Sequence, residues 1–424
     1  MLRNYFKIAI AVLMRRKFFT FISLFGISLT LTVLLVMTSF FDKMFSPNYP
    51  DFDRNRSLHI SKVALMNSKE GWYNGSSASF HLLETITSKL KTPQKVSIYT
   101  FSGSSDAYIN NKKLALDYKF TDATFWEVTE FQFLEGKPYS DEDVRTAQKV
   151  AVITEHTRES YFNDDKNVSG KFIELDNVQY RVIGVVKGVP NPNRNFHSDV
   201  YLPYTASKID HRRIGKPDKV KISLVDRYMG GFGAVLVAKS ADELPEMRKE
   251  LDQLLKRMFK PEDGYDKLYV HADTPLEAFS RNIVGGDDSP NIGKLIGYGT
   301  LLIILFLLLP AINLININIT RIMERSSEIG VRKAFGATSR TLVYQFLVEN
   351  LILTVIGGIV GTVLALIVIY VYNNSGIQPD INLTLNFRVL GVGLLLCLFF
   401  GVLSGVYPAW RMSRLNVVHA LKSK

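Results

Sequence analysis

Residues 18–41 read FFTFISLFGISLTLTVLLVMTSFF, an apolar run without a charged side chain. A helix rises about 1.5 Å per residue and the hydrocarbon core of a bilayer is about 30 Å thick, so this run is long enough to cross a membrane. Three further apolar runs lie near the C-terminus, at residues 295–319, 345–372 and 389–407. The sequence therefore predicts four transmembrane α-helices, with one large segment, residues 42–294, inserted between the first and the second.

Lysine and arginine predict the orientation of these spans. The segments 1–17, 320–344 and 408–424 together hold 14 basic and 2 acidic residues, whereas the whole chain has a net charge of +11. Because cytoplasmic segments near spans are enriched in lysine and arginine, we expect both termini and the 320–344 loop to be cytoplasmic. Residues 42–294 and the short loop 373–388 would then lie outside. The basic balance follows from this topology, so it does not indicate nucleic-acid binding.

The N-terminal end fits a retained span better than a cleaved signal. A secretory signal has a shorter apolar region and a small-residue cleavage site, whereas this run extends over 24 residues to Phe41. Residues 1–17 mix basic and apolar positions and predict an amphipathic helix at the inner membrane surface. The single cysteine, Cys397, lies in the fourth run. The 42–294 segment therefore depends on a hydrophobic core of its own, without a disulfide.

The inserted segment has mixed α and β patterning. Near its start, a strand at 58–65, a helix at 80–90 and a strand at 96–101 follow one another, and the same order recurs near its end. This second unit comprises residues 232–238, 241–258 and 267–271. The middle, residues 105–210, is richer in short strands and turns, with strands expected at 150–154, 171–175 and 180–186. We therefore predict a β-rich insertion between two α/β halves.

The sequence carries none of the common catalytic motifs. Its histidines form no His-Glu-x-x-His pair, no Gly-x-Ser-x-Gly elbow occurs, and no Gly-Lys pair is followed by the serine or threonine of a phosphate-binding loop. The centres of the predicted spans hold no lysine, arginine or aspartate, which disfavours an ion-driven pump. We expect a non-enzymatic chain that binds no metal or cofactor.

The most informative local sequence is ERSSEIGVRKAFGAT, residues 324–338, in the predicted cytoplasmic loop. Ser327 is suited to cap a short helix, Glu328 and Arg332 have i, i+4 spacing, and Gly336 is suited to end it. Thr338 is placed to cap the helix that leads into the third span. The residues themselves leave two interpretations open: a solvated connector, or a docking helix that pushes on a soluble partner.

This loop, followed by QFLVENL at 345–351 and a Gly-Gly-x-x-Gly helix, resembles the permease signature shared by MacB, FtsX and the lipoprotein-releasing Lol transporters. The tail from Tyr407 to Leu421 is similar to the closing motif of that family. Residues 125–144 and 150–186 resemble the MacB-type periplasmic domain. The resemblance implies a type VII ABC transporter permease in a bacterial inner membrane, with residues 42–294 in the periplasm.

In such permeases, motion of an ATPase is transmitted to the periplasmic domain, an activity termed mechanotransmission. The resemblance assigns the ATPase-coupling helix to Glu328, Ile329, Gly330, Val331, Arg332, Lys333 and Ala334, ending at Gly336. This sequence departs from MacB in having no fused nucleotide-binding domain, so ATP and Mg²⁺ are expected on a separate ABC ATPase chain. Further expected partners are a second permease copy, identical or a paralogue, a periplasmic adaptor and an outer-membrane channel, besides membrane lipid.

Glycines in the last two spans predict close helix packing. Gly357, Gly358 and Gly361, and the pair Gly401 and Gly405, would allow two backbones to approach closely. The sequence does not decide whether these faces meet a second copy or a neighbouring span. For the function, export from the periplasm is the leading expectation. The alternatives are lipoprotein release or control of cell-wall hydrolases by the same architecture, and a membrane-anchored sensor or binding module without a motor.

Overall fold

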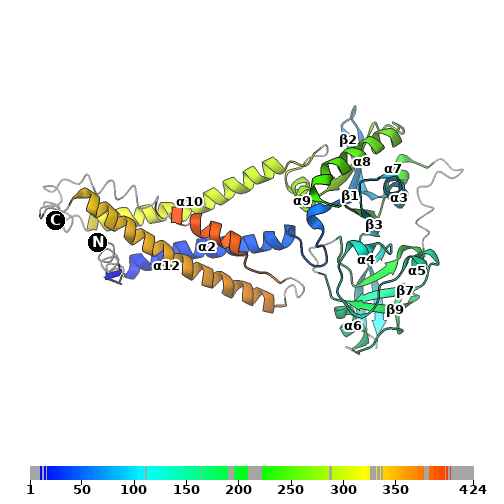
Figure 1. Cartoon of the computed structure of the whole chain (residues 1–424), viewed down its shortest axis with the longest axis horizontal. Coiled ribbons are helices and arrows are strands. Elements are labelled where there is room, and N and C mark those ends of the chain that lie inside the picture. Colours follow the sequence, from blue (N-terminus) through cyan, green and yellow to red (C-terminus); the bar gives the residue numbers. More distant parts are fainter. Residues whose placement is uncertain are drawn as a thin grey trace. The chain divides into compact units, whose positions relative to one another are not determined.

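The computed structural model describes residues 10–11, 14–15, 17–109, 112–163, 165–189, 195–208, 222–285, 289–324, 331, 335, 338–376, 382–396, 398–399 and 402. The chain divides into two compact units (Figure 1). The first unit combines Met1–Lys43 with Gly293–Lys424, and the second unit is Met44–Ile292.

The first unit consists of long apolar helices. They are α2 (Lys17–Phe45), α10 (Ile292–Glu324), α12 (Ser339–Asn374) and a shorter helix at Phe387–Leu396. Within the described residues, α2 and the part of α12 from Leu347 to Asn374 are long and apolar enough to cross a membrane. The described apolar part of α10 is Ile292–Phe306. The first three predicted runs and the described start of the fourth, residues 389–396, thus fall in helices, while the number of spans stays a prediction.

One half of the second unit is built from two interlocked β-α-β units. The first comprises β1 (Ser57–Asn67), α3 (Phe80–Lys89) and β3 (Lys95–Thr100), and the second comprises β12 (Phe232–Val237), α8 (Leu244–Met258) and β13 (Lys267–Asp273). Strand β12 pairs antiparallel with both β1 and β3, and β13 pairs antiparallel with the other edge of β1. The resulting order β3-β12-β1-β13 is that of a ferredoxin-like sheet. Both predicted strand-helix-strand orders are confirmed, and the structure joins them in one layer.

Helices α3 and α8 cover one face of this layer. Leu82, Leu83 and Ile86 of α3 share one core with a row on α8, Met247, Leu251 and Leu255, spaced four residues apart. The sheet contributes Leu58, Ile60 and Leu236 to the same core. Since residues three and four apart lie on one face of a helix, the apolar spacing of α8 explains which side it buries.

Smaller elements complete this half: η1 (Arg54–Arg56), β2 (Trp72–Ala78), α7 (Leu224–Tyr228), β11 (Met229–Gly230), η3 (Ala241–Glu243) and α9 (Pro275–Val284).

The other half lies between β3 and β12 in the sequence and is rich in strands, as predicted. Its elements are β4 (Gly103–Ile109), β5 (Lys112–Thr121), α4 (Phe125–Val128), β6 (Phe133–Gly136), α5 (Asp141–Arg145), β7 (Val150–Thr154), α6 (Glu155–Phe162), β8 (Phe172–Leu175), β9 (Val178–Val186), β10 (Val200–Pro203) and η2 (Tyr204–Ala206). Strands β7, β8 and β9 are the three predicted ones. Strand β5 meets β3 at Tyr99 and Thr121, which continues the sheet into the first half.

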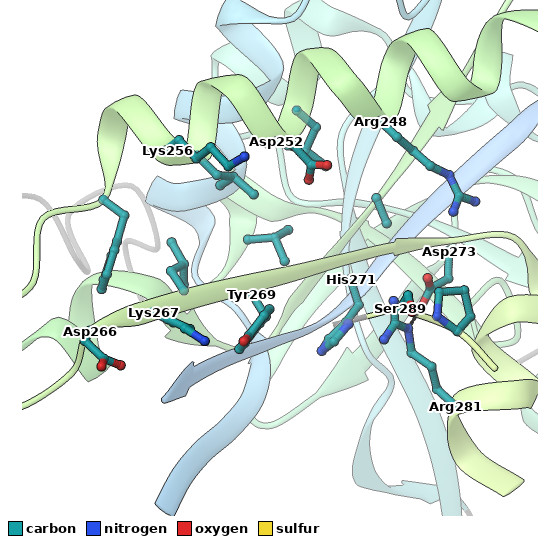
Figure 2. A pocket seen from close by; sticks show the side chains of 17 residues that line it. Arg248, Asp252, Lys256, Asp266, Lys267, Tyr269, His271, Asp273, Arg281 and Ser289 are labelled. Atoms are coloured by element: carbon teal, nitrogen blue, oxygen red, sulfur yellow. Dashed lines mark hydrogen bonds and ion pairs between the residues drawn. The ribbon is translucent and has the colours of Figure 1, made fainter. Parts of the chain in front are cut away.

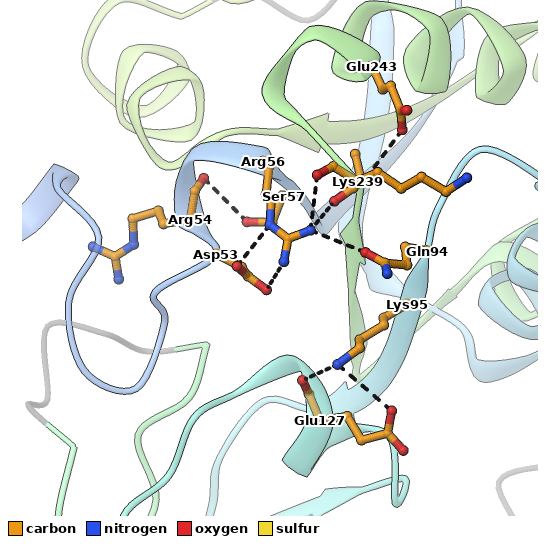
Figure 3. Close-up of polar contacts among 10 residues, drawn as sticks. Asp53, Arg54, Arg56, Ser57, Gln94, Lys95, Glu127, Lys239 and Glu243 are labelled. Carbon is orange, nitrogen blue, oxygen red and sulfur yellow. Dashed lines mark hydrogen bonds and ion pairs between the residues drawn. The ribbon is translucent and has the colours of Figure 1, made fainter.

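Polar contacts join the two halves (Figure 3). Lys95 of β3 donates to the Glu127 carbonyl oxygen of α4 at 3.0 Å. Deeper in the junction, Lys119 is completely buried, and its Nζ donates to the carbonyl oxygens of Thr100 at 3.1 Å and Asn195 at 2.9 Å. Burial lowers the pKa of Lys119 to about 7. The junction thus holds one exposed contact, between Lys95 and Glu127, and one buried lysine, beside an apolar core that residues of both halves share.

His59 is expected to make the stability of the second unit depend on pH. It is 4% exposed, with Nδ1 3.1 Å from the Asn195 amide nitrogen and Nε2 3.3 Å from Ser57 Oγ. Burial lowers its pKa below 6.5, although nearby Asp51 acts in the opposite direction. Below about pH 6.5, the unfolded chain binds a proton at His59 that the folded chain does not bind. The free energy of unfolding therefore falls by up to about 1.4 kcal/mol per pH unit.

Unfolding monitored between about pH 7 and pH 5 checks this expectation. A His59→Asn variant should lose less stability on acidification than the wild type. His156, which is exposed on α6, provides the matched control for the substitution itself. Identical pH dependence of the His59→Asn variant and the wild type would contradict the assignment.

Candidate functional site: the cytoplasmic loop and the helix it precedes

The described part of the loop presents two exposed apolar side chains. Phe335 is 88% exposed and Val331 is 44% exposed. The Phe335 backbone N–H donates to the Val331 carbonyl oxygen at 3.0 Å, which is the i to i+4 bond of a helical turn. The remaining predicted coupling residues lie outside the described residues: Glu328, Ile329, Gly330, Arg332, Lys333, Ala334 and Gly336.

Thr338 caps the long helix that follows the loop, as predicted. Its Oγ1 accepts a hydrogen bond from the Thr341 backbone N–H at 3.3 Å, and α12 begins at Ser339. A helix of 36 residues is about 54 Å long. Because Phe335 stands only three residues before the cap, a force applied at this side chain acts close to the end of one continuous helix.

The glycines of α12 lie against two other helices of the same unit. A Cβ atom on Gly361 would lie 2.8 Å from the Ser28 carbonyl oxygen of α2, and a Cβ on Gly357 would lie 2.8 Å from Ile27 Cγ2. A Cβ on Gly358 would lie 2.9 Å from Leu394 Cδ2, in the helix Phe387–Leu396. This glycine face therefore meets neighbouring helices of its own chain. Gly401 and Gly405 lie outside the described residues.

A shared hydrogen bond reinforces the contact between α2 and α12. The Thr32 hydroxyl lies 2.7 Å from the Ser28 carbonyl oxygen and 3.0 Å from the Gly361 carbonyl oxygen, so it can donate to both. Leu31, which is completely buried, packs in the same region, where a Cβ on Gly361 would lie 3.0 Å from Leu31 Cβ. Small residues and interhelical hydrogen bonds are what hold helices together in lipid.

Replacing Gly361 by valine is expected to destabilise the first unit by about 1–3 kcal/mol, because the new side chain meets backbone atoms of Ser28 that cannot move independently of α2. The free energy of unfolding in mixed detergent micelles measures this loss. Gly26 of α2 is the matched control, since nothing lies within 4 Å of a Cβ at that position. Equal stability of the Gly361→Val and Gly26→Val variants would show that the close approach is absent.

Within the described residues, no group of three or more His, Cys, Asp or Glu side chains is placed to hold a metal ion. The described residues of this region combine an exposed aromatic side chain, a capped long helix and a glycine-lined contact to α2.

Comparisons with known proteins assign the chain to a family. A model of the MacB-like periplasmic core domain matches residues 20–254, which is more than half of the chain, and a model of the FtsX-like permease C-terminal region matches residues 300–417. The chain belongs to the MacB-like family of ABC transporter permeases. The resemblance noted in the loop and in the inserted segment is confirmed.

Curated relatives are similar over part of their length. A pyoverdine export ATP-binding/permease protein, PvdT, from Pseudomonas fluorescens is 28% identical over 307 residues, covering 72% of this chain and 42% of the relative. The macrolide export ATP-binding/permease protein MacB of Campylobacter jejuni is 25% identical over 294 residues, covering 68% and 41%. The chain thus spans about two fifths of the length of these relatives.

Among solved structures, the periplasmic region of MacB from Actinobacillus actinomycetemcomitans is 17% identical to this chain, with a TM-score of 0.37. The match covers 55% of this chain and 94% of that one. The extracellular domain of the transporter YknZ from Gram-positive bacteria is 16% identical, with a TM-score of 0.35, covering 49% and 98%.

The family membership sets the coarse function. Members are inner-membrane permease components of ABC transporters and carry a periplasmic domain. MacB-like permeases work with ABC ATPases. This chain is accordingly a membrane permease, and its second unit corresponds to the periplasmic α/β domain.

Proposed function

We propose that this chain is a non-catalytic permease subunit that transmits the ATP-driven motion of a separate ATPase chain to its periplasmic domain, and that this motion drives export from the periplasm. The observation that carries the proposal is the position of Phe335. Its side chain is 88% exposed directly before the capped start of α12. An exposed aromatic side chain beside basic residues is typical of a docking surface for another protein.

In this proposal the coupling helix of residues 328–334 docks on the ATPase, which binds ATP and Mg²⁺, and this chain needs no cofactor. Closure of two ATPase subunits would move the loop, and α12 would carry that movement along its length. The close contacts of Gly357 and Gly361 with α2 make the two helices suited to move together. The first unit would supply four spans with both termini cytoplasmic, and cargo would not pass between them.

A second permease copy, identical or a paralogue, completes the proposed assembly, because the ATPase subunits of ABC transporters act as a pair. Export is the favoured task because two similar proteins, PvdT and MacB, are export proteins. A periplasmic adaptor and an outer-membrane channel would complete the route. Lipoprotein release, control of cell-wall hydrolases, and a sensor without a motor are the outcomes that the experiments must separate from export.

Charge reversal in the coupling helix tests the proposal. In an Arg332→Glu variant, or with Gly330→Trp, we expect the chain to fold in the membrane while ATP no longer moves the periplasmic domains. The readout is the distance between spin labels on two copies, placed at Lys249→Cys in a Cys397→Ser background, with and without trapped ATP. Lys249 is exposed on α8, so the label should not disturb the fold.

The matched control is Arg257→Glu, a charge reversal on the exposed side of α8 that should leave the ATP-dependent distance change intact. An unchanged distance response in the Arg332→Glu and Gly330→Trp variants would count against coupling through this loop. A lipoprotein or a cell-wall hydrolase bound stoichiometrically to the wild-type complex would replace export by the corresponding alternative.

A further inference from the structure

Helix α9 turns its polar side towards the interior of the second unit. Glu277 forms an ion pair with Arg248 of α8. Arg281 Nε lies 2.7 Å from Asp273 Oδ2 of β13, and Figure 2 shows these two residues at one end of the pocket between α8 and β13. Ser280, on the same side of the helix, is completely buried. The polar residues of α9 therefore pack against the protein.

The apolar residues of α9 lie on its opposite side. Ile283 is 63% exposed and Leu276 is 37% exposed, and the two are seven positions apart, which is about two helical turns. Phe279 lies between them on the same side, and we call these three residues the α9 stripe. Residues 286–288, outside the described residues, read GDD and carry no apolar side chain to cover the stripe. Since an amphipathic helix usually buries its apolar side, the orientation of α9 is inverted.

The end of α2 lies against the α9 stripe. The Phe279 ring packs edge-on against Phe45 with 5.2 Å between the ring centroids, and both residues belong to the second unit. Asp42 is the first charged residue of α2 after Lys17, and Phe45 follows it by about 4.5 Å along the helix. The polar interface adds about 5–8 Å to each side of the hydrocarbon core. A span that leaves the hydrocarbon at Asp42 therefore holds Phe45 and Phe279 in the interface.

Further exposed apolar side chains lie near the end of α2. Met44 is 45% exposed and Phe52 is 47% exposed, and Arg54, two residues after Phe52, donates to the Met44 carbonyl oxygen. Strand β13 ends beside the start of β1, since Asp273 pairs with His59, and α9 follows directly. Large exposed apolar patches mark sites of contact with proteins or membranes. This end of the sheet is therefore the apolar end of the second unit.

We propose that the α9 stripe inserts into the periplasmic leaflet of the membrane beside the end of α2. Apolar side chains at this depth leave water for the boundary between headgroups and acyl chains, while the polar side of α9 keeps its ion pairs within the protein. The contact with Phe45 favours lipid over a second copy or another protein, because lipid is the medium that α2 meets at this depth. The inference uses α2 as a span and does not depend on coupling through the 320–344 loop.

Quenching of a fluorescent label by lipid tests this proposal on the full chain in nanodiscs. The label is bimane at Ile283→Cys in a Cys397→Ser background, and the quencher is phosphatidylcholine with a nitroxide near the headgroup end of one acyl chain. We expect quenching about threefold stronger than for a label at Tyr73→Cys. Tyr73 is the matched control, because it is 58% exposed and pairs with Met66, about 30 Å along β1 from Ser57.

A charge within the stripe sharpens the test. With the label at Leu276→Cys, Ile283→Asp should lower quenching about threefold, because a carboxylate opposes insertion into lipid, whereas Ile283→Val should preserve it. Both variants should fold, since Ile283 is exposed. Equal quenching of the labels at Ile283→Cys and Tyr73→Cys, or quenching at Leu276→Cys that Ile283→Asp leaves unchanged, would overturn the proposal. Disulfide cross-linking of Ile283→Cys between two copies, without quenching by lipid, would overturn it in favour of a contact between copies.

Discussion

Replacing Arg54 by methionine is expected to lower the free energy of unfolding of the second unit by about 3–5 kcal/mol. Arg54 is 6% exposed and Asp51 is 2% exposed, and Arg54 Nε lies 2.8 Å from Asp51 Oδ2. Arg54 also donates to the carbonyl oxygens of Met44 at 2.8 Å and Ser46 at 3.3 Å. Without the guanidinium, Asp51 becomes a buried charge without this partner, and two carbonyl oxygens lose a donor.

Thermal or denaturant unfolding of the full chain, followed by tryptophan fluorescence, measures this effect. Arg145→Met is the matched control, because Arg145 forms an ion pair with Glu142 at the same i, i+3 spacing but on the surface. Exposed pairs contribute about 0–1 kcal/mol. The double variant Arg54→Met, Asp51→Leu should be more stable than Arg54→Met alone. A similar loss of unfolding free energy in Arg54→Met and Arg145→Met would show that the buried Arg54–Asp51 pair does not stabilise the second unit.

Arg54 lies where the chain passes from α2 into β1. Met44 and Phe45 are the last residues of α2, and Arg54, just before β1, donates to the Met44 carbonyl oxygen. The Phe45 ring packs edge-on against Phe279 of α9 at 5.2 Å, and α9 lies just before α10 in the sequence. Phe45, near the start of the second unit, and Phe279, near its end, are therefore in contact.

Replacing Phe335 by aspartate is expected to weaken association with the ATPase by about 2–4 kcal/mol, which is roughly 30-fold or more, as removal of a central aromatic contact does at other interfaces. The Phe335 side chain is 88% exposed, so its loss should cost the folded chain little. The measurement is the affinity of the purified permease in nanodiscs for its co-purifying ATPase.

Tyr73→Asp is the matched control for this experiment. Tyr73 is an aromatic residue of β2 in the second unit and is 58% exposed, so the same substitution there should leave ATPase affinity unchanged. A Phe335→Asp variant that binds the ATPase as tightly as the wild type does would remove this side chain from the docking surface.

The sequence predicted those parts of the fold in which hydrophobic periodicity is strong. Helix α8 repeats apolar residues every four positions, and β12 is an apolar run that is buried along its whole length. Strands β2 and β4 were not predicted, because Tyr73 to Ser76 are exposed and β4 starts with the small and polar residues Gly-Ser-Ser-Asp. Their strand conformation comes from pairing with β1 and β5, which local sequence does not encode.

The candidate functional site, too, could be predicted from the sequence only in part. The cap at Thr338 and the glycine spacing in α12 follow from local chemistry and were predictable. The partner of those glycines was not predictable, because Ile27 and Ser28 of α2 carry no motif and lie more than three hundred residues away in the chain.

Purification of this chain from native membranes in mild detergent, followed by mass spectrometry of the bound proteins, tests the central claim most directly. The account predicts a stoichiometric ABC ATPase with a phosphate-binding loop, retained when ATP is trapped and lost in the Phe335→Asp variant. Recovery of the intact chain without any ATPase, under ATP-trapping conditions as well, would contradict the motor-coupled permease and leave a membrane-anchored binding module in its place.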